Sequence, residues 1–93
     1  MKTYLIQRNV PGAGKFSEAE RKTLSQRSCK VLDELGPQIQ WLHSYITDDN
    51  LWCIYQAEDV ELIKEHARRG PFPLNNVLKV HSMISPATAE LVV

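Results

Sequence analysis

The 93-residue sequence has no run of about 18 apolar residues, which a membrane-spanning helix would need. Its first eight residues also lack the uninterrupted apolar core of a secretory signal peptide. Only two cysteines are present, Cys29 and Cys53, which is too few for a disulfide scaffold. These absences predict a cytoplasmic protein with reduced thiols and no membrane partner.

The sequence has no excess of charge of either sign, because eleven Lys and Arg balance eleven Asp and Glu. Proteins that bind nucleic acid by neutralising phosphates carry a basic surface, so we expect no nucleic-acid partner. A phosphate-binding loop is also missing, since Gly12-Ala13-Gly14-Lys15 has neither the upstream glycine nor the following Ser or Thr of that motif. The length and the 43% apolar content are typical of one globular domain, which we place over residues 1–93.

The pattern along the chain predicts six elements in the order βαββαβ. Strands are expected at 3–8, 38–47, 51–57 and 76–85, and helices at 17–35 and 59–69. Ser17 and Glu20 indicate a capping box, Gly36-Pro37 and Gly70-Pro71 end the helices, and Asp48-Asp49-Asn50 is typical of a hairpin turn. This order indicates a ferredoxin-like α+β fold, in which a four-stranded antiparallel sheet carries both helices on one face.

The second face of such a sheet has no helices to cover it. Alternation along the strands assigns most aliphatic residues to the helix side, and it leaves a mixed set on the other face: Gln7, Trp41, His43, Tyr45, Cys53, Tyr55, His81 and Met83. This assignment requires a three-residue hairpin turn that places Tyr45 opposite Cys53. A two-residue turn would instead place Ser44 opposite Cys53, and a one-residue slip reverses the faces. The simplest cover for so apolar a face is the same face of a second copy, in an isologous homodimer.

His43 and Cys53 are the residues of this face best suited to a metal, because imidazole and thiolate favour zinc, nickel or copper over calcium or magnesium. His81 would add a second imidazole. No CxxC, HxxxH or HExxH motif is present. The alternative interpretation makes Cys53 a small buried hydrophobe and His43 a hydrogen-bonded histidine. On the two helices, we interpret Cys29 as a packing residue and His66 as an ordinary boundary histidine.

Two segments, Trp41-Leu42-His43-Ser44-Tyr45 and Cys53-Ile54-Tyr55, resemble a family of small bacterial proteins long described as a domain of unknown function. One branch of that family binds nickel. The resemblance extends over about residues 3–90. It implies a ferredoxin-like subunit that pairs into a dimeric α/β barrel and serves in nickel buffering or in the response to excess metal. It also implies site roles for His43, Tyr45, Cys53 and Tyr55, whereas His81 departs from the family pattern.

The leading prediction is a non-catalytic homodimer that binds Ni²⁺, or alternatively Zn²⁺ or Cu²⁺, through His43, Cys53 and His81. Four further residues would line the site: Gln7, Trp41, Tyr45 and Tyr55. One alternative is a small dimeric α/β-barrel enzyme, oxygenase- or isomerase-like, that binds an organic ligand in the sheet-face cavity. In that case His43 would act as base, with Tyr45 or Tyr55 as proton donor. Another alternative is an interaction module that uses this face for dimerisation and binds no ligand.

Overall fold

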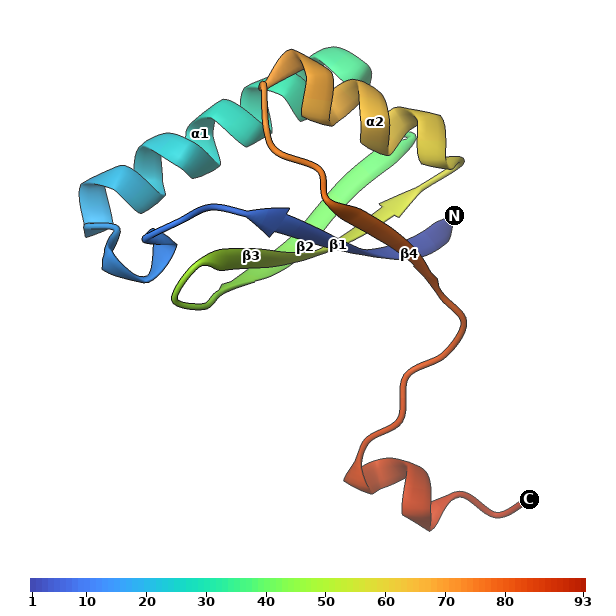
Figure 1. Cartoon of the computed structure of the whole chain (residues 1–93). Helices are drawn as coiled ribbons and strands as arrows, with labels where there is room; N and C mark the ends of the chain where they lie inside the picture. The colour runs from blue at the N-terminus through green and yellow to red at the C-terminus, as the bar shows by residue number, and fades with distance from the viewer.

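Two helices cover one side of a four-stranded antiparallel sheet in the computed structural model, which describes all 93 residues (Figure 1). The elements are β1 (Lys2–Asn9), η1 (Ala13–Lys15), α1 (Glu18–Leu35), β2 (Ile39–Ile46), β3 (Asn50–Ala57), α2 (Val60–Arg69), β4 (Asn76–Val80) and η2 (Pro86–Glu90). The spatial order of the strands is β2-β3-β1-β4. The predicted ferredoxin-like α+β class is confirmed. Neither helix combines the length and the apolar character needed to cross a bilayer.

Both helices begin at side-chain caps, of which the Ser17–Glu20 capping box is predicted from the sequence. Ser17 accepts a hydrogen bond from the Glu20 backbone N–H, and the Glu20 carboxylate accepts one from the Ser17 N–H. Asp59 accepts from the backbone N–H groups of Glu61 and Leu62 at the start of α2. Each cap satisfies donors that the first helical turn would otherwise leave unpaired. α1 ends at Gly36, whose φ of +87° is one that glycine adopts without a steric penalty.

The β2–β3 hairpin closes with the two-residue turn Asp48-Asp49. The Thr47 backbone N–H donates to the Asn50 carbonyl over 2.9 Å, and Ser44 consequently lies opposite Cys53. A bulge then interrupts β2, because Trp41 pairs with Tyr55 while His43 pairs with Ile54, the preceding residue of β3. Leu42 is therefore the extra residue of the strand.

The helix side of the sheet forms the core. Its buried members are Tyr4, Ile6, Ile39, Leu51, Cys53, Tyr55 and Ala57, which pack together with Ile63 of α2 and Ala13 of η1. Residues paired across antiparallel strands share a face, so the pairings also define the opposite, helix-free face. It consists of Thr3, Leu5, Gln7, Gln40, His43, Tyr45, Trp52, Ile54, Gln56, Asn76, Leu78 and Val80.

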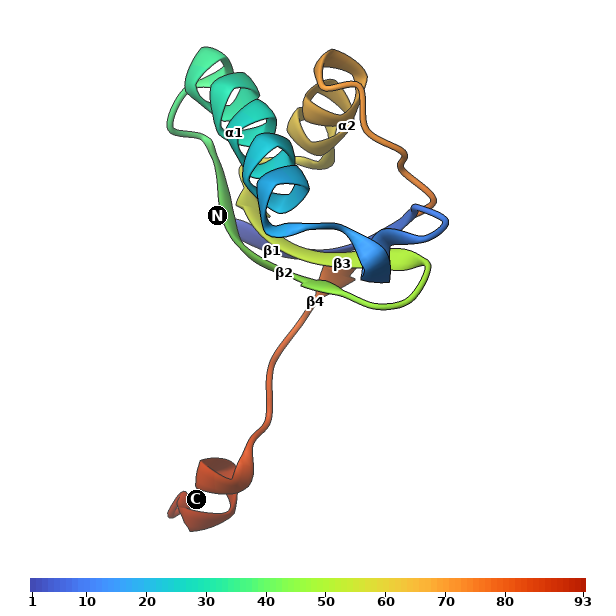
Figure 2. The same cartoon turned by 90° about the vertical axis from the view of Figure 1, so that its left-hand side faces the viewer.

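The last strand ends at Val80, five residues earlier than the predicted span of 76–85. Val80 pairs with Thr3, so β4 has almost reached the start of β1 and has no further partner to pair with. Residues 81–93, which we call the C-terminal arm, leave the sheet on its helix-free side and end away from the body (Figures 1 and 2). The arm raises the radius of gyration to 14.6 Å, whereas a globular chain of this length would have about 12 Å.

Candidate functional site

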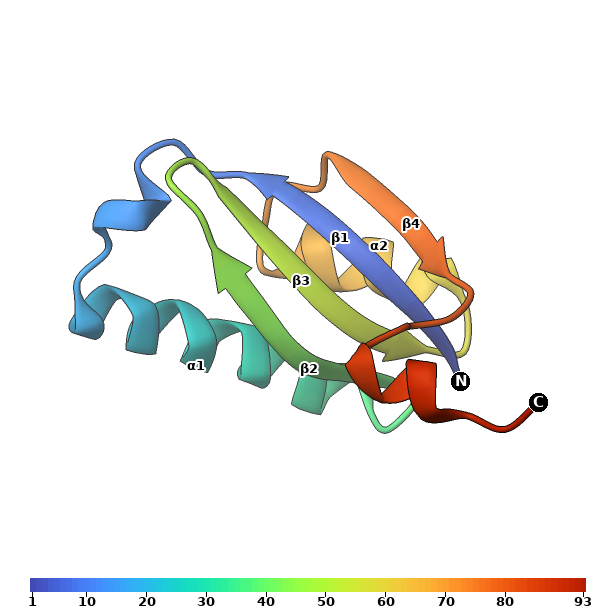
Figure 3. The same ribbon diagram turned by 90° about the horizontal axis from the view of Figure 1, so that it is seen from below.

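Three of the predicted site residues lie on the helix-free face, which Figure 3 shows from in front. His43 is exposed there, and its ring meets the edge of the Tyr45 ring with the two centroids 5.1 Å apart. Gln7 lies on the same face and is held by hydrogen bonds, since its amide donates to Asn50 over 3.2 Å and accepts from Asn76 over 2.7 Å. The local polar groups therefore include one free imidazole and one fixed amide network.

Cys53, Tyr55 and Trp41 lie on the other side of the sheet, so their predicted place on the helix-free face is wrong. The two-residue turn is the cause for Cys53 and Tyr55, because it pairs Ser44 with Cys53. The bulge at Leu42 is the cause for Trp41, because it returns this ring to the helix side next to Tyr55, at 6.5 Å between centroids. Cys53 is only 2% exposed and packs in the core.

The predicted metal ligands do not meet within one chain. His43 and Cys53 lie on opposite faces of the sheet, and His81 is an exposed residue that directly follows β4. The chain contains no group of three His, Cys, Asp or Glu residues that could hold a metal ion.

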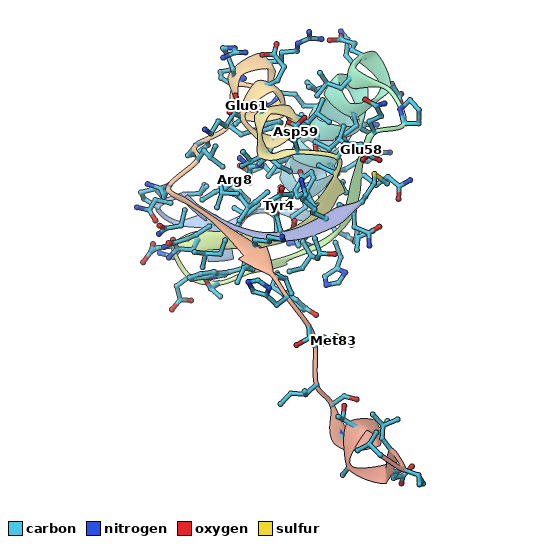
Figure 4. All side chains as sticks on the ribbon, turned by 90° about the vertical axis from the view of Figure 1, so that its right-hand side faces the viewer. Tyr4, Arg8, Glu58, Asp59, Glu61 and Met83 are labelled. Atoms are coloured by element: carbon cyan, nitrogen blue, oxygen red, sulfur yellow. The ribbon has the colours of Figure 1, made fainter.

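A cavity of about 280 Å³ lies on the helix side of the sheet, where the sequence predicted only core. Apolar side chains dominate its lining, and they include Phe16, Leu24, Trp41, Leu51, Cys53 and Phe72. Arg8 comes from β1, in the layer between the sheet and the helices where Tyr4 also lies (Figure 4). The alternation of β1 indicates this placement, because Arg8 follows the buried Tyr4 and Ile6 at a spacing of two residues and therefore shares their face.

The Arg8 side chain is almost fully enclosed, with 4% of its surface exposed. One terminal nitrogen, Nη1, donates to the Pro73 carbonyl over 2.7 Å. The other, Nη2, is buried and has no hydrogen-bond partner. The guanidinium carbon lies 5.4 Å from the centre of the Phe72 ring and 5.9 Å from that of Tyr55. Arg8 is thus held by a carbonyl and two aromatic rings, and no carboxylate neutralises it.

A second buried polar cluster lies next to Arg8. The Ser28 hydroxyl is 3.1 Å from Nε2 of His66 and 3.4 Å from the Tyr55 hydroxyl. His66 is 1% exposed, so its interpretation as a boundary histidine is wrong. The interpretation of Cys29 as a packing residue is also wrong, because Cys29 is exposed. Burial, together with the positive charge of Arg8, lowers the pKa of His66 to about 4, and burial raises the pKa of Tyr55. Both groups are therefore neutral at pH 7.

The Ser28–His66 pair differs from a hydrolytic dyad in one decisive respect. A catalytic histidine is oriented by a third group that binds its second nitrogen. Here Nδ1 of His66 is buried and has no partner. The cluster therefore lacks the third group that would orient its histidine as a catalytic base. Nothing in the sequence indicated that Ser28 would meet His66.

The arrangement described above is that of a ferredoxin-like α+β protein with an uncovered sheet face. Residues 4–80 match the family described as "Nickel responsive protein SCO4226-like", and the chain belongs to this family. The match confirms the resemblance seen in the sequence.

The crystal structure of SCO4226 from Streptomyces coelicolor A3(2) has a similar fold. The TM-score is 0.74 at 8% sequence identity, and the similarity covers 88% of this chain and 99% of that chain. At this identity the likeness concerns the fold alone. No curated protein matches this chain.

Proposed function

We propose that this protein binds nickel as a homodimer and holds the metal at the helix-free face with ligands from two chains. The observation that carries the proposal is the family match over residues 4–80, whose description names nickel. The exposed His43 imidazole supports the location, because it stands on the one sheet face that no helix covers. Such a protein would serve in nickel buffering or in the response to excess nickel.

The extent of exposed surface supports the homodimer. The chain exposes 6490 Å², whereas a folded monomer of this mass would expose roughly 5,500 Å². The difference is close to the roughly 800 Å² that each partner contributes to a standard interface. Large apolar side chains are exposed on this side, with Leu78 on the helix-free face 56% exposed and Met83 on the C-terminal arm 84% exposed. A second copy on this side would cover the face and the arm together.

Two chains would supply a set of ligands that one chain lacks. Each chain offers His43 on the helix-free face and His81 at the start of the C-terminal arm. Four imidazoles from a dimer would suit nickel, copper or zinc, since imidazole is a common ligand of all three. The thiol of Cys53 lies behind the sheet, in the core. We therefore propose His43 and His81 as the ligands. Substitution of Cys53 tests the alternative set, in which its thiol also binds the metal.

A nickel titration of chelator-stripped, tag-free protein tests this proposal. Calorimetry is expected to show saturable binding in the wild type, and a loss of at least about tenfold in affinity for His43→Ala and for His81→Ala. Cys53→Ser and its exposed counterpart Cys29→Ser should both bind as wild type. Wild-type binding by His43→Ala would contradict the location. A sulfur-to-nickel charge-transfer band that disappears in Cys53→Ser would overturn the ligand assignment and restore the one predicted from the sequence.

A further inference from the structure

The lining of the helix-side cavity has an excess of positive charge, and these charges have no part in the proposed nickel site. Three arginines line it, Arg8, Arg21 and Arg27, and no Asp or Glu is among the lining residues. None of the three makes a salt bridge: Arg21 donates to the Phe16 carbonyl, and Arg27 lies 4.8 Å from the centre of the Phe72 ring. From this geometry we propose that the cavity binds a small organic carboxylate with a flat apolar body, whose carboxylate pairs with Arg8.

Arg8 provides the anion-recognition part of the site. A buried cation without a counter-charge is costly, and buried charges in proteins are normally paired. Here Nη1 is occupied by the Pro73 carbonyl, while the buried Nη2 has a donor to spare. Arg8 lines the cavity, so a carboxylate bound there would neutralise its guanidinium, because arginine and carboxylate are matched in geometry. Tyr55 and Ser28 also line the cavity, and their hydroxyls, 3.4 Å apart, are neutral polar groups near Arg8.

The rest of the lining specifies the body of the ligand. Trp41 and Phe72 contribute aromatic surfaces, and Leu24 and Leu51 add aliphatic ones. A bare inorganic anion would leave these walls facing water, whereas small-molecule sites typically combine apolar walls with a few polar groups that orient the ligand. The volume of about 280 Å³ is at the lower end of such sites, so the body should be a single ring or a short branched chain.

This site is separate from the proposed nickel site, because the sheet lies between them. The enzyme alternative from the sequence placed an organic ligand on the helix-free face, and the structure provides a cavity on the opposite face. Loss of nickel binding in His43→Ala would leave the carboxylate site intact. Failure of either proposal can therefore be recognised without reference to the other.

Fluorescence of Trp41 provides the readout for the test. The Trp52→Phe variant removes the second tryptophan, which lies on the helix-free face, and makes Trp41 the only indole of the chain. We expect phenylacetate to change its emission saturably, with a Kd of about 1 mM or tighter for a ligand of about ten heavy atoms. Phenylacetamide has the same shape without the charge, and it should bind at least about tenfold more weakly.

Three results of these titrations would overturn the proposal. One is equal binding of phenylacetamide and phenylacetate, because charge would then play no part. Another is equal binding of inorganic phosphate, which would make this a site for a bare anion. The third is an absence of saturable change up to about 10 mM phenylacetate. These comparisons use the same protein throughout, so they stay decisive even where an Arg8 variant does not fold.

An Arg8→Met variant separates recognition from structure. Methionine keeps much of the apolar stem and removes the unpaired charge, so we expect phenylacetate affinity to fall at least about tenfold while the unfolding temperature stays the same or rises. Arg69→Met at the exposed end of α2 is the matched control and should bind phenylacetate as wild type. Unchanged affinity in Arg8→Met would contradict the role of Arg8 in binding.

Discussion

The Ser28 hydroxyl oxygen lies 3.1 Å from Nε2 of His66, and this hydrogen bond joins α1 to α2 in the interior of the protein. The same hydroxyl is 3.4 Å from the Tyr55 hydroxyl of β3, so one serine connects both helices and the sheet. All three side chains are buried. The protonation state of His66 and the presence of the Ser28 hydroxyl should therefore both influence stability.

Protonation of His66 should make the fold less stable in mild acid. Burial and the charge of Arg8 lower the pKa of His66 from 6.5 to about 4 in the folded state, whereas the unfolded chain keeps the ordinary value. Between pH 6.5 and about pH 4 the unfolded chain binds this proton and the folded chain does not. The free energy of unfolding should therefore fall as the pH decreases through this window, by about 3 kcal/mol at most. Urea unfolding measured at several pH values tests this.

Replacement of the histidine isolates this effect from that of the carboxylates, which titrate in an overlapping range. His66→Gln should show a flatter dependence of unfolding free energy on pH between 4 and 6.5 than the wild type. His43→Gln removes an exposed histidine and should keep the wild-type slope. Equal slopes for His66→Gln and the wild type would show that the buried imidazole is not responsible.

Removal of the Ser28 hydroxyl should destabilise the protein. Ser28→Ala leaves Nε2 of His66 and the Tyr55 hydroxyl without this partner in a buried site. An unsatisfied buried polar group costs about 1–3 kcal/mol, which exceeds the few tenths that alanine gains as a helix former. Ser25→Ala, in the same helix at a partly exposed position, controls for helix propensity and should change stability by less than about 0.5 kcal/mol. Equal stabilities of the two variants would contradict the structural role of Ser28.

A charge on the helix-free face should dissociate the proposed dimer. Leu78 lies on this face opposite Leu5, so Leu78→Glu would bury a carboxylate between two copies without a partner. Size-exclusion chromatography with light scattering should give a dimer mass for the wild type and a monomer mass for this variant. Lys79→Glu changes the adjacent residue, which points to the helix side, and should remain dimeric. A monomeric wild type would rule out the homodimer.

The local features of the fold could be predicted well because each depends on a few adjacent residues. Ser17 with Glu20, and Asp59 before α2, form caps whose donors and acceptors lie within three positions of one another. The class of fold followed from the order of these elements. The end of β4 was missed because it is set by the start of β1, which lies at the other end of the chain.

The candidate site was harder to predict because it depends on register. The two-residue turn at Asp48-Asp49 and the bulge at Leu42 together decide which side of the sheet receives Cys53, Tyr55 and Trp41. Asp48-Asp49-Asn50 suits turns of either length, and Leu42 has no property that marks a bulge. Arg8 was missed for another reason. Arginine side chains are normally exposed, and only the spacing of two from Tyr4 and Ile6 indicates that Arg8 points toward the helices.

The bulge at Leu42 has a consequence for changes in chain length. Trp41 and His43 pair with the adjacent residues Tyr55 and Ile54, so a chain without Leu42 would form a regular ladder with both neighbours on their present faces. Deletion of Ser44 would instead reverse the face of the residues between the deletion and either the bulge or the turn. Leu42 is thus the position at which β2 can lose a residue and still keep its indole in the core and its imidazole outside.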